Sequence, residues 1–92
     1  MNHYKYWNGR VGQLEGTFDK GIEVIDLIIQ QEKLVDFKGL IKLGIQTDPW
    51  TIIELNGVRI KIGRSGIYEL DCVLVNSLKF VNGATAMVDY VI

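Results

Sequence analysis

The amino-acid sequence predicts an all-β fold, an antiparallel β-sandwich or jelly-roll-like barrel of seven or eight short strands, in a single domain over residues 1–92. Three observations lead to this prediction. Asn-Gly pairs, which favour tight hairpin turns, occur at 8–9, 56–57 and 82–83, each beside β-favouring residues. Other glycines and the single proline break the chain about every ten residues, which is the spacing of short strands. The apolar content of 48% is enough for a core, and no linker or repeat divides the chain.

Residues 1–20 are predicted to form an N-terminal arm or an edge hairpin, with its turn at Asn8-Gly9. Gly12 and Gly16 follow this turn. Glycine weakens a strand because it has no side chain to pack and loses much backbone freedom on folding. We therefore expect the strand after Asn8-Gly9 to be interrupted.

Residues 22–30 are β-branched and form a short run, which favours a strand. A short helix within 22–36 is the alternative, because Ile25, Ile28 and Ile29 also suit one face of a helix. The residues at 30–35 add good helix formers. Periodicity alone leaves both interpretations open.

Residues 39–46 are predicted to form a strand bounded by glycines, and Asp48-Pro49-Trp50 a turn after it. The next element is the most strongly specified of the chain. Asn56-Gly57 supplies the two positive φ angles of a type I′ turn, whose two-residue loop fixes the strand register. Glu54 then lies opposite Arg59, and opposite charges across a strand pair contribute some tenths of a kcal/mol.

The segment Gly63-Arg64-Ser65-Gly66 predicts a sharp corner or bulge before a strand that begins at Ile67. Its glycines and arginine could also bind a phosphate group. No helix N-terminus follows them and the full phosphate-loop pattern is missing, so a corner explains Gly63, Arg64 and Gly66 better.

The chain is predicted to end in a third hairpin, with its turn at Asn82-Gly83 and strands at 74–81 and 84–92. Its register would place Phe80 opposite Thr85. The last strand ends without a polar tail, and strand edges without proline can pair with another chain. We therefore expect this last strand, or the N-terminal arm, to contact a second subunit.

Exposed aromatic side chains are the candidates for contact with a ligand or another chain. The aromatic strip near the N-terminus is least assured of burial in the core, although an edge strand packed on the core is the alternative. Trp50 follows a proline in a loop, where a packed position at the rim is the favoured interpretation and a contact residue is the alternative. The candidate contact residues are Tyr4, Tyr6, Trp7, Trp50, Tyr90 and Ile92.

The sequence does not indicate an enzyme. Glu69 and Asp71 share one face of a strand, and the alternation of side chains leaves both in solvent. Cys72 lies in an apolar run and is interpreted as a small core residue. The one histidine, His3, lies near the N-terminus, and with a single cysteine it cannot make a zinc site. We expect no catalytic residue, no metal and no cofactor.

The net charge of −1, with basic residues scattered among acidic ones, argues against a nucleic-acid partner. No apolar run approaches the roughly 18 residues of a membrane-spanning helix. The residues at 1–5 lack the apolar segment of a signal peptide, so we expect the chain to be made and kept in a cytoplasm, or to be exported by something other than a cleaved leader.

The segments 43–51, 62–70 and 88–90 resemble small β-rich modules of phage and prophage structural proteins from low-GC Gram-positive bacteria, particularly in tails and baseplates. The resemblance covers residues 41–92, and the Gly-Arg-x-Gly-Ile-Tyr-Glu core is its most specific part. Two residues depart from the pattern of these modules: Ser65 replaces a threonine, and Trp50 replaces a glycine-like turn residue.

The resemblance implies a non-enzymatic structural role in a virion or phage-like particle, with the chain as a homo-oligomer in contact with other phage structural proteins. The alternative function is a carbohydrate-binding β-sandwich that stacks aromatic side chains on a host cell-surface glycan. Such modules combine aromatic platforms with clustered polar side chains, and this sequence shows no obvious cluster beside its aromatic residues.

Overall fold

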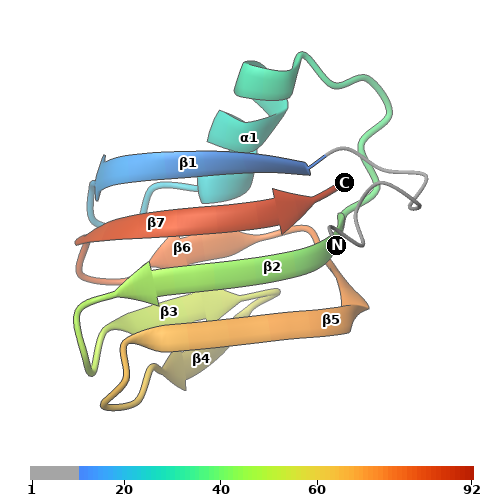
Figure 1. Cartoon of the computed structure of the whole chain (residues 1–92). Coiled ribbons are helices and arrows are strands. Elements are labelled where there is room, and N and C mark those ends of the chain that lie inside the picture. Colours follow the sequence, from blue (N-terminus) through green and yellow to red (C-terminus); the bar gives the residue numbers. More distant parts are fainter. Residues whose placement is uncertain (1–10) are drawn as a thin grey trace.

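The computed structural model describes residues 11–92, with Cys72 described by its backbone alone, and the chain forms a β-sandwich with one helix (Figure 1). In spatial order, the four-stranded sheet contains β1 (Val11–Phe18), β7 (Ala84–Val91), β2 (Leu40–Thr47) and β5 (Ile67–Val75). The three-stranded sheet contains β4 (Val58–Lys61), β3 (Ile52–Leu55) and β6 (Leu78–Phe80). The helix α1 (Val24–Glu32) connects β1 to β2. The predicted antiparallel sandwich is confirmed, with seven strands in the part of the chain that the structure describes.

The core lies between the two sheets, because successive side chains of a strand point to opposite faces and the apolar ones point inward. The Phe18 ring of β1 stacks on the Phe80 ring of β6, with their centroids 5.1 Å apart. This contact joins the two sheets near one side of the sandwich. The largest fully buried side chains are Tyr90, Phe80, Ile28, Leu40, Leu43, Ile45, Ile53, Ile62, Leu78, Val24, Val75 and Val88.

Residues 24–32 form a helix, so the favoured strand interpretation of 22–30 is wrong and the helix alternative is confirmed. The Glu23 carboxylate caps the helix by accepting a hydrogen bond from the N–H of Ile25 at 3.4 Å. Lys33 ends it in the left-handed conformation, with φ 54°. Val24, Ile25 and Ile28 are buried in the core. Burial of this apolar stripe outweighs the β-propensity of the same residues.

The hairpin around Asn56-Gly57 has the predicted geometry. Both residues have positive φ, 48° and 82°, and Glu54 lies opposite Arg59 as the register requires. The closest charged atoms of Glu54 and Arg59 are 3.9 Å apart. The expected strand over 39–46 is also present as β2, and residues 48–50 form the expected turn.

The corner at 63–66 is confirmed. The N–H of Gly66 donates to the carbonyl of Gly63 at 3.1 Å, and Gly66 has φ 70°. The backbone of Gly66 packs so closely on the carbonyl oxygen of Thr47 that a Cβ would overlap it. The carbonyl of Gly66 also accepts the N–H of Thr47 at 2.8 Å, which fixes the corner against the end of β2. Arg64 is exposed at this corner.

The predicted third hairpin is wrong, because the strands on either side of Asn82-Gly83 belong to different sheets. β6 pairs with β3, whereas β7 pairs with β1 and β2. A turn does occur, since the N–H of Gly83 donates to the carbonyl of Phe80 at 3.0 Å and Gly83 has φ 75°. The turn carries the chain from one sheet to the other, because the apolar side chains of β6 are buried against β3.

β1 runs without interruption through Gly12 and Gly16, so the expected break is also wrong. Gly12 lies opposite Tyr90, and the Tyr90 ring occupies the space that a side chain at Gly12 would need. Packing of this ring over the glycine compensates for the weak strand propensity of Gly12. The Asn8-Gly9 turn lies outside the described residues.

Candidate functional site

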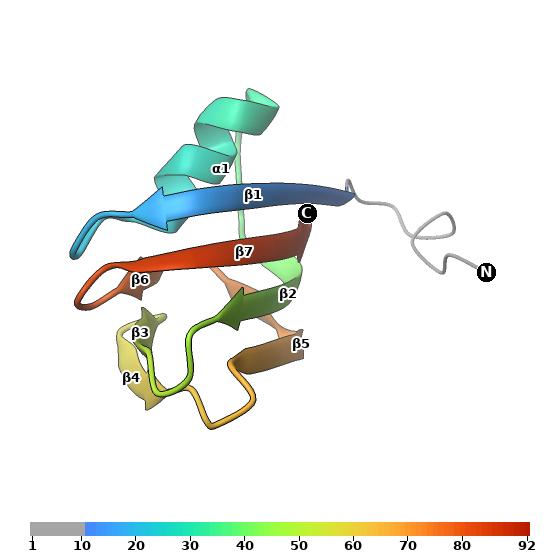
Figure 2. The same cartoon turned by 60° about the vertical axis from the view of Figure 1, so that its left-hand side comes forward.

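The two sides of the sandwich differ (Figure 1; Figure 2). We call the side where α1 lies beyond β1 and β6 the closed side, and the side formed by the outer edges of β4 and β5 the open side. On the closed side, the Gln31 side chain donates to the edge carbonyl of Gln13 in β1 at 3.1 Å. Glu23 forms an isolated bridge with Lys79 of β6. Among residues 11–92, no strand pairs with the outer edge of β4 or β5.

Exposed apolar side chains gather on the open side. Within the described residues, eight large apolar side chains are exposed, and five of them lie on β4, on β5 or in the turn beside them. Val58 is the most exposed of the five, at 61%. Apolar side chains on an unpaired strand edge are a common feature of surfaces that bind another chain. The five are Trp50, Val58, Ile67, Val73 and Leu74.

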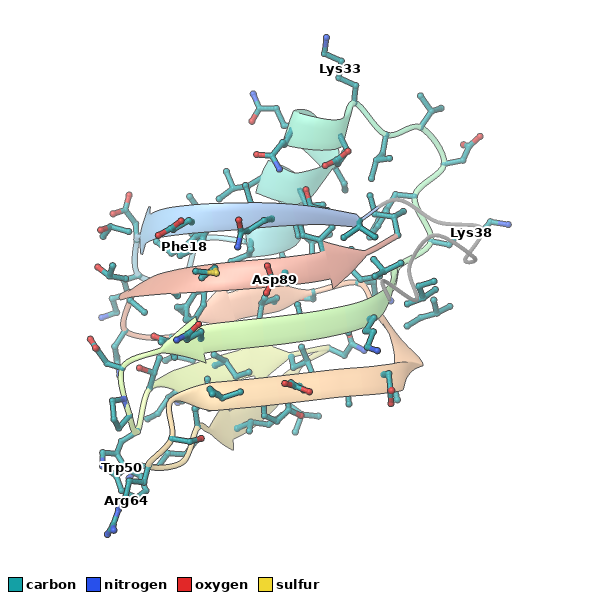
Figure 3. All side chains as sticks on the ribbon, in the orientation of Figure 1. Phe18, Lys33, Lys38, Trp50, Arg64 and Asp89 are labelled. Carbon is teal, nitrogen blue, oxygen red and sulfur yellow. The ribbon has the colours of Figure 1, made fainter. Side chains whose placement is uncertain are left out.

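Trp50 is exposed at the end of the open side, and in the view of Figure 3 it projects from the same corner of the molecule as Arg64. The Lys61 ammonium group lies 5.9 Å from the centroid of its ring, within the range of a cation–π contact. The backbone of Trp50 has φ 68°, in the left-handed region that favours glycine. A bulky exposed residue in this conformation is unfavourable for stability.

Tyr90 and Ile92 do not form an exposed contact surface. Tyr90 is only 1% exposed, and Ile92 is half-buried against the core. β7, which precedes Ile92, pairs with a strand on each side, so its edges cannot accept another strand. The expectation that the last strand contacts a second subunit through its edge is therefore wrong, because β7 lies inside the four-stranded sheet. Tyr4, Tyr6 and Trp7 lie outside the described residues.

Tyr90 instead anchors α1 to the four-stranded sheet. Its hydroxyl donates to Glu32 at 2.6 Å and accepts a hydrogen bond from the Gln31 amide at 2.7 Å. Burial, together with the hydrogen bond to Glu32, raises the pKa of Tyr90 to about 12. The role of this tyrosine is structural in the described part of the chain.

Asn56 has a role that the sequence did not reveal. Its side-chain oxygen accepts the N–H groups of Asn76 and Ser77, at 2.9 and 3.2 Å. Its side-chain nitrogen donates to the carbonyl of Leu74 at 2.9 Å. The turn of the β3–β4 hairpin therefore also holds the connection from β5 to β6. Only the positive φ of Asn56 could be predicted, because these partners are about 20 residues away in sequence.

The described surface includes a groove and a depression that are both shallow. A groove of about 570 Å³ lies between β1 and α1, with apolar side chains from Leu14, Ile22 and Leu27. A depression of about 390 Å³ lies on the outer face of the four-stranded sheet over Gly44, which has Glu69 and Asp89 as its neighbours across the sheet. Figure 3 shows Asp89 on this face.

The depression has two acidic residues, Glu69 and Asp89, on either side of Gly44. Glu69 and Asp71 are both exposed on the outer face of the sheet, as the strand alternation predicts. Within residues 11–92, no group of three or more His, Cys, Asp or Glu side chains could hold a metal ion. In the same residues, no helix has the length and apolar character needed to cross a membrane.

Comparisons with known proteins found no matching family model, no matching curated protein and no matching solved structure. The inference of function therefore depends on the surface of this chain and on its sequence resemblance alone.

Proposed function

We propose that this protein is a non-enzymatic assembly subunit that acts through contacts with further copies of itself and with other structural proteins. The observation that carries this proposal is the open side, where two unpaired strand edges coincide with five exposed apolar side chains. An unpaired edge readily accepts a strand from another chain. The exposed apolar side chains beside that edge are then removed from water, which favours association.

The resemblance to phage modules specifies the assembly: a bacteriophage or prophage-derived particle, in its tail or baseplate. The most specific part of the resemblance, over 63–69, contains the corner that leads into β5. The segments of the resemblance therefore include one strand of the open side. A subunit of this kind is synthesised in the bacterial cytoplasm and then enters the particle.

Light scattering on the purified chain, measured over a range of concentrations, tests the assembly role. We expect a closed oligomer with a mass that is an integer multiple of 10.4 kDa. A monomer at every concentration would contradict self-assembly, since the proposal requires contacts between copies.

The second candidate function is glycan binding, and the exposed, strained position of Trp50 favours it. An exposed indole ring can stack on a sugar ring. Addition of cell-wall polysaccharide would then shift the tryptophan fluorescence. Trp50→Ala should abolish this shift and Trp7→Ala should retain it if Trp50 is the platform. An equal shift in both variants argues against Trp50 as the platform.

A further inference from the structure

We propose that β4 of one copy pairs with β5 of a second copy, and β5 of the first with β4 of the second, about a two-fold axis parallel to the strands. This inference rests on the proposed function, because it assumes that copies associate, and it specifies the surface, the register and the symmetry. The partner on the open side is thus another copy of the same chain.

Charge distinguishes this partner from a generic one. Arg59 and Lys61 of β4 point outward from the sandwich, and so do Glu69 and Asp71 of β5. All four residues are exposed. The two free edges therefore carry opposite charge. A pairing of β5 with β5 would bring acidic residues together, and a pairing of β4 with β4 would bring basic residues together. Like charges across a strand pair are destabilising, whereas opposite charges attract.

The backbone N–H and C=O groups of β4 that do not bond to β3 belong to its charged residues. The N–H of Ile62 donates to the carbonyl of Thr51 at 2.8 Å, so these residues form a hydrogen-bonded pair. In an antiparallel ladder such pairs alternate with pairs that do not bond to each other. Arg59 and Lys61 are therefore in the second class, and their N–H and C=O groups point away from β3.

The backbone of β5 has the same arrangement. The N–H of Thr47 donates to the carbonyl of Gly66 at 2.8 Å, which identifies that pair as hydrogen-bonded. Hydrogen-bonded and non-bonded pairs alternate along β2 and β5 from this point. Glu69 therefore forms a non-bonded pair with Gly44, and Asp71 forms one with Lys42. The N–H and C=O groups of Glu69 and Asp71 therefore point to the free edge.

One antiparallel register satisfies both charge and hydrogen bonding. It places Arg59 opposite Asp71 and Lys61 opposite Glu69, and all four residues direct their backbone groups toward the partner strand. Ile60 then lies opposite Leu70, on the inner face of the joined sheet, and both are partly buried already. A shift by one residue would oppose a charged side chain to an apolar one and would direct the hydrogen-bonding groups away from each other.

The positions of the two strands permit both pairings at once. β4 and β5 lie on the same side of the sandwich, one in each sheet (Figure 1; Figure 2). They run in opposite directions, because the short corner at 63–66 joins the end of β4 to the start of β5. Rotation by 180° about an axis along the strands therefore brings each edge antiparallel to the other edge of the second copy. The four-stranded sheet of each copy continues into the three-stranded sheet of its partner, so the assembly is closed and symmetric.

Charge reversal tests this pairing. One variant carries R59E and K61E, which makes β4 acidic, and the other carries E69K and D71K, which makes β5 basic. We expect each variant to dimerise about 100-fold more weakly than the natural chain in sedimentation equilibrium, because four attractive pairs per dimer become repulsive. An equimolar mixture of the two variants should recover a one-to-one dimer, because both of its edge contacts again join opposite charges. A single chain with all four changes should recover dimerisation as well.

Two control variants make the same changes in charge at positions outside β4 and β5. Lys33→Glu with Lys38→Glu gives the same change as the first variant, and Figure 3 shows both residues away from β4 and β5. Glu15→Lys with Asp19→Lys gives the same change as the second variant, on β1 and the residue after it. These two controls should dimerise like the natural chain.

Folding is checked by circular dichroism and thermal unfolding of each variant. Arg59 lies opposite Glu54, Asp71 lies opposite Lys42, and Lys61 contacts Trp50, so a reversal at any of these three positions also disturbs its own copy. Glu69→Lys alone is the second test, because Glu69 lies opposite Gly44 and its reversal leaves the fold intact. It should weaken dimerisation about 10-fold.

The outcomes separate the two proposals. An oligomer that both charge-reversed variants retain overturns the edge pairing alone, and the assembly role stands. Failure of the mixture to recover a dimer also overturns the pairing. A natural chain that remains monomeric overturns both.

Discussion

The closed and open sides of the sandwich manage strand edges in two different ways. On the closed side, a helix supplies side chains to the polar groups of the neighbouring strands. Glu23 accepts the hydroxyl of Ser77 and the N–H of Leu78, both at 2.7 Å. On the open side, the edges of β4 and β5 have no strand partner in the described residues, and opposite charges mark them.

The difference between the two sides separates residues that stabilise the monomer from residues that can contact another chain. The closed side contributes to the stability of the monomer, because its side chains are buried and its polar groups are paired. The exposed side chains of the open side contribute little to the monomer, so they are available for contact with another chain. Substitutions on the two sides should therefore separate stability from assembly.

The largest expected effect is at Ile28, which is 0% exposed on the closed side. Ile28→Ala should lower the free energy of unfolding by about 3 kcal/mol, because it removes buried methyl groups and leaves a cavity. The same substitution at Ile67, which is 52% exposed on the open side, should cost about 0.5 kcal/mol or less. Urea unfolding at a concentration where the chain is monomeric compares the two. Equal losses would show that the two sides do not differ.

The next effect is at Gly66, the corner that leads into β5. Gly66→Ala should cost at least about 2 kcal/mol, because Gly66 has φ 70° and its Cβ would overlap the Thr47 carbonyl oxygen. Gly63→Ala in the same corner is the matched control, since nothing lies within 4 Å of its Cβ position. Thermal unfolding of both variants measures the difference, and a tolerated Gly66→Ala would contradict the close packing.

Glu23→Ala should destabilise the closed side by about 2 kcal/mol. The change removes the helix cap and leaves the N–H of Leu78 without its carboxylate acceptor. Glu15→Ala, at an exposed position of β1, is the control and should have little effect. Hydrogen exchange at the Leu78 amide should accelerate in the Glu23 variant. Unchanged protection there would disprove the role of Glu23 as the acceptor of the Leu78 N–H.

Tyr90→Phe should cost about 1 kcal/mol near neutral pH, because it removes the hydrogen bonds to Glu32 and Gln31. The folded pKa of Tyr90 is about 12, above its ordinary value of 10.0, so the unfolded chain loses this proton first. The contribution is complete below about pH 10 and is lost as pH rises toward about 12. The free energy of unfolding of the natural chain should therefore fall over this range by more than that of Tyr90→Phe.

The smallest expected effect is at Trp50. Trp50→Gly should raise the free energy of unfolding by about 0.5 kcal/mol, because glycine adopts φ 68° without strain while the contact with Lys61 is lost. Differential scanning calorimetry can detect such a change. A large loss of stability would mean that Trp50 is a packed rim residue, which was the favoured interpretation of its sequence position.

Several local elements could be predicted from sequence with their geometry. Asn56-Gly57 determined a type I′ turn and with it the pairing of Glu54 with Arg59, because a two-residue loop leaves one register. The corner at 63–66 was predictable for the same reason, since few residues other than glycine adopt the required φ. In the candidate site, the exposure of Glu69 and Asp71 followed from strand alternation. The loop position of Trp50 did not decide its exposure, because a packed position at the rim was the favoured interpretation and the side chain is 54% exposed.

Other features depended on contacts between distant residues. The isoleucines at 25, 28 and 29 suit a strand or a helix, and burial beside β6 selected the helix. The turn at Asn82-Gly83 was predictable, but the two strands beside it joined different sheets. β7 lies between β1 and β2, so the last strand has no free edge. No local sequence pattern could predict this position.

By itself, the sequence determined the fold class, the tight turns and the alternation of side chains, because each depends on residues close together in the chain. Tertiary structure alone decided which strands lie at the edges and that the basic edge of β4 and the acidic edge of β5 share one side. The physical reason is that sheet order is set by burial of apolar faces contributed by distant segments, and the order then determines which backbone groups and charges remain at the surface.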